Sequence, residues 1–201
     1  MFVFILHMHP FIILAAGNSS RMGQPKPFVK LNNRLTLLEN LVVELKNCNI
    51  KQIVAVLNNK GNQILETHYS YLKQAIEIVI NPFPEKGRLF SLKTGITKTG
   101  ITPLFVQNVD NPFINKELID GMSNLLTRSA FVVPEYQHKG GHPVLISAEI
   151  VDDMLNKSLE TDNLRTFLSH YKKITYACTF QEILLNLNQP SDIEVFKKKF
   201  K

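Results

Sequence analysis

Short apolar runs alternate along this chain with longer segments that mix apolar and polar residues. Five of these runs are bounded by turn residues and have the length of a buried strand. They cover residues 11–16, 52–57, 76–80, 104–109 and 130–134. In the segments between them, apolar residues recur at helical spacing and predict helices over residues 37–45, 89–97 and 116–126. Strands and helices therefore alternate.

The strand runs are apolar at almost every position rather than at every second one. I-I-L-A at residues 12–15 and I-V-A-V-L at residues 53–57 are examples. Such strands are buried on both faces, which is typical of a parallel sheet with helices on each side. With right-handed crossovers, the pattern predicts an α/β fold of three layers around a doubly wound, mostly parallel sheet of the Rossmann-like kind.

Beyond residue 135 the pattern loosens. It predicts an extended segment over residues 142–147, a helix from about residue 148, another over about residues 162–171, two short strands, and a last helix after Pro190. No linker-like composition and no internal repeat interrupts the chain. We therefore expect a single domain over residues 1–201, because roughly 100 to 200 residues is the usual domain size.

The composition is that of a soluble globular protein, with 44% hydrophobic and 20% charged residues. The net charge of +6 at first suggests a nucleic-acid partner, but four of the lysines lie within residues 197–201. A basic end of this kind is commonly a solvated helix terminus. No aromatic and basic motif accompanies it, so binding to nucleic acid is not expected.

The cysteines and the first residues bear on the location of the protein. Cys48 and Cys178 are far apart and lack metal-ligand spacing, so we expect core thiols rather than a zinc site or a disulfide framework. Such sparse cysteine use fits a reducing cytoplasm. Residues 1–9 lack the basic start of a signal peptide, and we interpret them as a short lead-in to the first strand. No run is long enough to span a membrane, so a cytoplasmic protein is expected.

The polar segment after the first strand is the most informative part of the sequence. Residues 12–26 read I-I-L-A-A-G-N-S-S-R-M-G-Q-P-K. Small residues at positions 15–17 keep the strand end slim enough for a ligand to lie against the backbone, and Arg21 and Lys26 follow as cations. Unpaired N–H groups in the turn also favour an anion. The segment therefore predicts a phosphate-binding loop, although it matches neither the P-loop nor the dinucleotide pattern.

A second polar segment follows the strand over residues 104–109. The strand ends in Asp110-Asn111-Pro112, which places one carboxylate at the carboxyl edge of the sheet. Magnesium bound with a nucleotide needs only one or two carboxylates besides phosphate oxygens and water, so Asp110 is a candidate Mg²⁺ ligand. The alternative is an acidic residue that stabilises the start of the helix over residues 116–126.

The string L-A-A-G-x-S-x-R-M-G-x-x-K resembles the signature of the nucleotidyltransferases related to the molybdopterin cytidylyl- and guanylyltransferases. That group also includes sugar-phosphate and methylerythritol-phosphate nucleotidyltransferases. The resemblance implies that this loop wraps a nucleoside triphosphate, and that the Asp-x-Pro at Asp110 is the metal site. It assigns nucleotide contacts to Leu14, Ala15, Ala16, Gly17, Ser19, Arg21 and Lys26, with Arg21, Lys26 and Asp110 as the catalytic residues.

Further motifs follow in the order of the family. Residues 81–92 resemble its N-P…G-x-x-x-S-L segment, which borders the nucleotide base and adds Asn81, Gly87 and Ser91 to the nucleotide site. Arg88 is interpreted as a positional residue. Ser91 has an equally strong alternative, a helical serine bonded to its own backbone.

The last motifs concern the acceptor and the metal. The Gly-His-Pro at His142 resembles the molybdopterin branch on its acceptor side, and Arg165 resembles an arginine of that branch. Residues 185–192 resemble D-[IV]-[DN]-T-P-E-D, which suggests Asn188 as a second metal ligand, although Asn186 replaces the leading acid. Asn188 as a helix cap before Pro190 is the alternative.

The resemblance implies a Mg²⁺-dependent enzyme that moves a nucleotide from a nucleoside triphosphate to a phosphorylated acceptor and releases pyrophosphate. We expect nucleotide binding from about residues 10–135 and acceptor binding from about residues 136–201. A-A-G at residues 15–17 favours CTP and a molybdenum cofactor cytidylyltransferase; a sugar-phosphate or small alcohol-phosphate acceptor is the alternative. Asn186 and Asn188 also allow a non-catalytic nucleotide-binding module. Lys26→Ala is expected to weaken turnover far more than folding, on the premise that Lys26 is an exposed loop residue.

Overall fold

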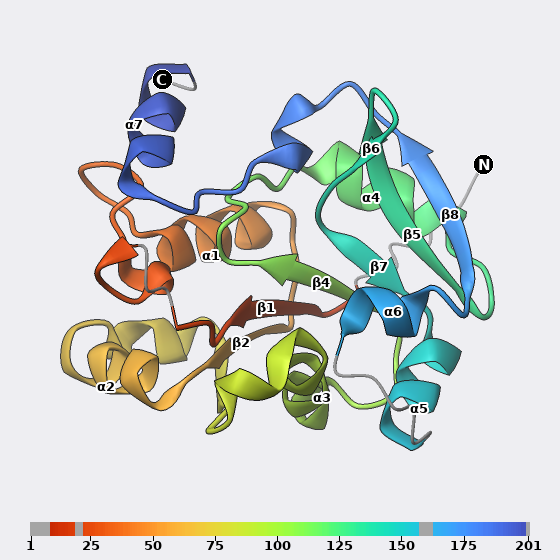
Figure 1. Ribbon diagram of the computed structural model, residues 1–201, viewed down its shortest axis with the longest axis horizontal. Helices are drawn as coiled ribbons and strands as arrows, with labels where there is room; N and C mark the ends of the chain where they lie inside the picture. Colours follow the sequence, from red (N-terminus) through yellow and green to blue (C-terminus); the bar gives the residue numbers. More distant parts are fainter. Residues whose placement is uncertain (1–8, 19–21, 157–162, 200–201) are drawn as a thin grey trace.

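The computed structural model describes residues 9–18, 22–156 and 163–199. Within these ranges eight strands form one mixed sheet (Figure 1). The strands are β1 (Phe11–Ala15), β2 (Ile53–Leu57), β3 (Glu77–Ile80), β4 (Leu104–Asn108), β5 (Ala130–Tyr136), β6 (Lys139–Gly140), β7 (Val144–Ile146) and β8 (Lys172–Ala177).

Helices connect the strands and cover both faces of the sheet. They are α1 (Leu37–Asn47), α2 (Asn59–His68), α3 (Gly87–Thr99), α4 (Lys116–Leu125), α5 (Ala148–Asn156), α6 (Leu164–Leu168) and α7 (Pro190–Lys199), with 3₁₀ turns at Lys26–Phe28, Ser70–Gln74, Pro84–Lys86 and Gln181–Leu184. None of the helices in the described ranges combines the length and the apolar character that crossing a membrane requires.

The order of the strands creates a switch point in the sheet. β3, β2, β1 and β4 lie side by side and run parallel, so the chain builds outward from β1 to β3 and then returns to the other side of β1 with β4. β7 pairs antiparallel with β4 and with β5, and β5 pairs in parallel with β8. In sheets of this kind, ligands bind outside the carboxyl ends of the strands where the order reverses, here between β1 and β4.

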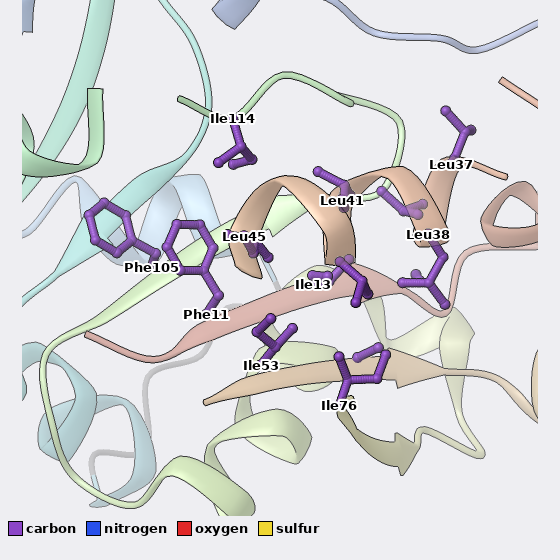
Figure 2. Packing of buried hydrophobic residues seen from close by; sticks show 14 of the residues in the cluster. Phe11, Ile13, Leu37, Leu38, Leu41, Leu45, Ile53, Ile76, Phe105 and Ile114 are labelled. Atoms are coloured by element: carbon purple, nitrogen blue, oxygen red, sulfur yellow. The ribbon is translucent and has the colours of Figure 1, made fainter. Parts of the chain in front are cut away.

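Alternate residues of the central strands enter two separate cores. Phe11 and Ile13 of β1 pack on one face with α1, where the Phe11 and Phe105 rings stack at 4.6 Å between centroids (Figure 2). Ile12 and Leu14 pack on the other face with α3 and α5. Both faces of the strands are therefore buried, as their continuous apolar sequences predict, and the three-layer, doubly wound α/β fold is confirmed.

The predicted strands and helices match the observed ones closely up to residue 126, with one omission. α2 carries few apolar residues, and only Gly61 and Leu65 of it are buried, so it offers no apolar stripe to detect. Its start is fixed instead by Asn58, whose side chain accepts a hydrogen bond from the N–H of Gly61 at 2.7 Å.

Two expectations for the last third of the chain need correction. The helix expected over about residues 162–171 is observed only as α6, because Asn163 caps its start and Ser169 ends it. Of the two short strands expected before Pro190, the described residues form β8, and a 3₁₀ turn at Gln181–Leu184 takes the place of the second. Where the apolar pattern loosens, β7 lies antiparallel between β4 and β5. The division into a nucleotide part and an acceptor part stays a prediction.

Gly95 lets α3 approach the sheet closely. A Cβ on Gly95 would lie 2.7 Å from Ile12 Cγ2 and 3.0 Å from Val56 Cγ2, both on the central strands. We expect Gly95→Ala to lower the free energy of unfolding by about 1–3 kcal/mol, because the helix must move away from the sheet. Urea denaturation measures this change. Lys98→Ala, on the exposed side of α3, is the matched control, and equal stability of the two variants would contradict the close approach.

Candidate functional site

The carboxyl ends of β1 and β4, which lie side by side in Figure 1, open into a cleft of about 240 Å³. Five separate parts of the chain line it: Leu14, Ala15, Ala16 and Gly17; Lys26; Pro84, Gly87, Arg88 and Ser91; Asn108, Val109 and Asp110; and Asn188. The structure thus gathers most of the predicted site residues in one place, at the switch point of the sheet.

The end of β1 forms the first wall of the cleft. Leu14, Ala15 and Ala16 are buried, so the strand end presents little side chain and mainly backbone to a ligand. Asn58, which directly follows β2, donates from Nδ2 to the carbonyl oxygen of Ala16 at 2.9 Å. Sequence reasoning missed Asn58. Its place immediately after a buried parallel strand is the signal that could have found it. Ser19 and Arg21, both predicted in this loop, lie outside the described residues.

Lys26 joins two predicted metal ligands. Its Nζ donates to Asp110 Oδ2 and to Asn188 Oδ1, each at 2.8 Å. The side chain of Lys26 is only 15% exposed and that of Asp110 only 10%. The premise that Lys26 is an exposed loop lysine is therefore wrong. The 3₁₀ turn that begins at Lys26 buries Pro27 and Phe28, and this packing turns the lysine inward.

The side chain of Asp110 lies in the cleft and does not cap α4, which has a different capping residue. Asn115 accepts the hydrogen bond from the N–H of Leu118 at 3.0 Å, so Asp110 does not cap α4 and that alternative is wrong. Asp110 Oδ1 is buried and has no hydrogen-bond partner within the described ranges. A carboxyl group with an unsatisfied oxygen in a cleft favours a cation. The donor set of Asp110 and the amide oxygen of Asn188 fits a hard cation such as Mg²⁺.

The segment before α7 holds Asn188 in place. Asp192 Oδ2 accepts hydrogen bonds from the backbone N–H groups of Asn188 at 2.8 Å and Gln189 at 3.0 Å. Burial opposes the charge of Asp192, but these backbone donors outweigh it and lower the pKa of the Asp192 carboxyl. Asp192 therefore fixes this turn, while the side-chain oxygen of Asn188 faces Lys26. Asn188 as the helix cap is wrong.

The start of α3 forms the wall opposite β1. Gly87 begins this helix with φ of 84°, in the region that favours glycine, and no described side chain caps its N–H groups. Ser91 Oγ donates to the carbonyl oxygen of Gly87 at 3.2 Å and accepts from Asn81 Nδ2 at 2.9 Å. The contacts of Ser91 are thus those of the helical alternative. Asn81 is fully buried behind Ser91 and does not line the cleft.

The two predicted acceptor residues lie in different places. His142 is partly buried and contacts Asn108, a residue of the cleft. The distance between His142 Nε2 and Asn108 Nδ2 is 2.8 Å. Arg165 is exposed on α6 and does not line the cleft, so its acceptor role stays a prediction. Asn108 and Arg88 also line the cleft. Sequence reasoning did not assign Asn108, although it is the last residue of β4 and stands two residues before Asp110.

The pKa of His142 is lowered from 6.5 to about 4, chiefly by burial; the charge of Asp110 opposes this shift and that of Arg88 adds to it. The unfolded chain therefore takes up this proton near pH 6.5, and the folded chain only near pH 4. We expect stability to fall as the pH drops through this window, by up to about 3 kcal/mol. Urea denaturation between pH 7.5 and pH 4, with EDTA present, measures this loss of stability.

Two variants test the origin of the loss. His142→Gln should remove this part of the decline in stability, and His138→Gln, at an exposed site, should keep it. Equal declines in all three proteins would contradict a buried neutral His142.

A switch-point cleft with a backbone-lined strand end, a lysine and a carboxylate defines a class of α/β proteins that bind nucleotides. Within that class, the chain belongs to the family of the MobA-like NTP transferase domain, whose family model matches residues 11–191. The expected family and the nucleotidyltransferase type of the fold are thereby confirmed.

Known proteins resemble this chain over almost its whole length. A probable molybdenum cofactor guanylyltransferase from Thermococcus sibiricus is 26% identical over 196 residues, which is 92% of this chain and 96% of the relative. A solved nucleotidyl transferase from Methanothermobacter thermautotroptrophicus has a TM-score of 0.78 at 19% identity and covers 96% of this chain and 98% of its own. Rv0371c from Mycobacterium tuberculosis, solved as a complex with manganese, has a TM-score of 0.71 at 15% identity, with 94% and 98% covered.

Proposed function

We propose that this protein transfers the nucleotide of a nucleoside triphosphate to a phosphorylated acceptor of the molybdopterin type and releases pyrophosphate. The observation that carries the proposal is the contact of Lys26 with Asp110 and Asn188 in the cleft at the switch point. It gathers a cation and two oxygen ligands where a triphosphate would lie along the end of β1. The name of the Thermococcus relative supports the class of acceptor.

The protein's own residues would act by positioning and by neutralising charge. An oxygen of the acceptor phosphate attacks the α-phosphorus, the bond to the bridging oxygen breaks, and pyrophosphate leaves with that electron pair. A phosphate nucleophile is already ionised near neutral pH, so no general base is needed. Lys26, Arg88 and the N-terminus of α3 supply positive charge along the cleft, and the backbone at the end of β1 holds the nucleoside.

A divalent cation fits this arrangement, and we propose Mg²⁺. Asp110 and Asn188 would hold it, since Asp110 Oδ1, which has no partner in the described part of the chain, and the amide oxygen of Asn188 belong to residues that line the cleft. When bound, Mg²⁺ neutralises charge on the phosphates of the donor and of the leaving group. The manganese in the Mycobacterium tuberculosis structure supports a cation in this fold.

GTP is the donor that the named relative supports, and CTP is the second candidate because residues 15–17 read A-A-G. We expect one of the two to raise the melting temperature by about 5 to 10 °C at a hundredfold excess over its dissociation constant, and more in Mg²⁺ than in EDTA. Thermal shift with GTP, CTP, ATP and UTP measures this. Pyrophosphate release with molybdopterin then tests the transfer. Equal behaviour of all four nucleotides would contradict a selective donor site.

The non-catalytic alternative rests on the neutral residues Asn186 and Asn188 in place of acids. It predicts the same thermal shift without any release of pyrophosphate in the presence of molybdopterin or of a sugar phosphate. Lys26 and Asp110, which a mere binding module would not need to keep in contact, favour the enzyme.

A further inference from the structure

The amide of Asn108 lies between His142 and the cleft. Asn108 ends β4 and is only 5% exposed, yet it lines the cleft. Its Nδ2 is the atom that faces His142 Nε2 at 2.8 Å. A neutral imidazole accepts a hydrogen bond through one ring nitrogen, so this contact uses the amide as a donor and turns its Oδ1 away from His142.

The environment of Asn108 Oδ1 can be deduced from the hydrogen bonds. In the described part of the chain, the fully buried side-chain atoms without a partner are Gln107 Oε1, Asp110 Oδ1 and Ser147 Oγ. Asn108 Oδ1 also has no partner among the described residues, but it is not one of these fully buried atoms, so it stays accessible. Because the cleft is the surface that Asn108 lines, Oδ1 faces the cleft as a free acceptor.

Asn108, the last residue of β4, and Asp110, two residues beyond it, each carry an acceptor oxygen that no donor of the described residues contacts. Both residues line the cleft. Asn188 adds a third oxygen, which Lys26 contacts. A carboxylate and two amide oxygens are the hard ligands that Mg²⁺ and Mn²⁺ prefer.

We propose that His142 is a positioning residue that holds the amide of Asn108, so that Asn108 Oδ1 serves as an additional oxygen ligand for the divalent cation bound with the nucleotide. This inference rests on the proposed function and deepens it. His142 then acts from behind the cation site rather than on the acceptor, in the way that outer partners orient the ligands of a metal.

The metal dependence of nucleotide binding tests this proposal without any turnover. The quantity to measure is the coupling ratio, defined as the dissociation constant of GTP in EDTA divided by that in Mn²⁺, by calorimetry; CTP replaces GTP if CTP gives the thermal shift. A ligand of the cation changes this ratio, whereas a group that touches the base or ribose changes both constants equally.

We expect Asn108→Leu and His142→Leu each to lower the coupling ratio about tenfold, and the double variant to lower it no further than Asn108→Leu alone. That coupling would separate positioning from a merely structural role, for which the two effects would add. Asn108→Asp keeps an oxygen at the same place and should preserve or raise the ratio, which keeps the proposal testable if Asn108→Leu does not fold. His138→Leu, at a fully exposed site, should leave the ratio unchanged.

Several results would overturn the proposal. One is an unchanged ratio in Asn108→Leu while Asp110→Asn lowers it, which would leave the proposed function intact. Another is that Asn108→Leu weakens nucleotide binding equally in EDTA and in Mn²⁺, which would indicate that Asn108 contacts the nucleoside rather than the cation. A lowered ratio in Asn108→Asp would exclude the oxygen as the cause. A ratio of one in the wild type would instead count against the metal of the proposed function itself.

Discussion

Asp110→Asn is expected to lower nucleotide transfer about 10² to 10³-fold; the fold also loses stability, because Lys26 loses its counter-charge, and transfer is therefore compared on folded protein. The substitution keeps the shape of the side chain but removes its charge, and Asp110 is the acid that faces Lys26 in the cleft. Loss of one preorganised electrostatic contact in a site of this kind typically costs that much in rate. Pyrophosphate release with the preferred nucleotide and molybdopterin measures the effect.

Asp120→Asn is the matched control for this prediction. Asp120 also contacts a lysine, Lys116, at 2.6 Å, but its side chain is 49% exposed on α4, away from the cleft. We expect its transfer rate to equal that of the wild type. If Asp110→Asn also transfers at the wild-type rate, the carboxyl edge of β4 is not the reaction site.

Lys26→Met is expected to lower the transfer rate about as much as Asp110→Asn does. It should also lower the free energy of unfolding. The methionine fills the space of the lysine stem but leaves the carboxylate of Asp110 without its cation. Removing one partner of a buried ion pair costs about 3–5 kcal/mol, and the pair here is nearly buried on both sides. Urea denaturation measures the stability, and pyrophosphate release measures the transfer.

The double variant Lys26→Met/Asp110→Asn separates the two effects. It removes both charges together, so we expect most of the stability to return while transfer stays lost. Lys30→Met is the control, because Lys30 is 52% exposed and lies 3.8 Å from Glu39; it should change stability by less than about 1 kcal/mol and leave transfer unchanged. A double variant as unstable as Lys26→Met alone would contradict the account of the buried pair.

Most of the fold could be predicted from the sequence, because strands that are apolar at every position must be buried on both faces, as in a doubly wound parallel sheet. The sequence could not reveal α2, whose residues are mostly polar, nor the insertion of β7 between β4 and β5. Pairing partners in a sheet depend on contacts between distant residues, and apolar periodicity does not encode them.

The candidate site was predictable where a short motif carries it, as at residues 14–17, Lys26 and Asp110. The surrounding amides were harder to find, because an asparagine after a strand is also an ordinary turn residue. Asn58 and Asn108 become significant only when β2 and β4 are seen to end beside β1. The burial of Lys26 likewise depends on Asn188, which is 162 residues away in the sequence.

That separation means that a growing chain cannot complete the cleft before residue 188 has been synthesised. The strand end, Lys26 and Asp110 are all synthesised long before Asn188, and the backbone N–H of Leu187 reaches back to the carbonyl oxygen of Asp110 at 2.8 Å. Nucleotide binding therefore requires both early and late parts of the chain. A chain truncated before this segment would retain much of its sheet but lack a complete binding site. During translation, the site can therefore form only after Asn188 has left the ribosome.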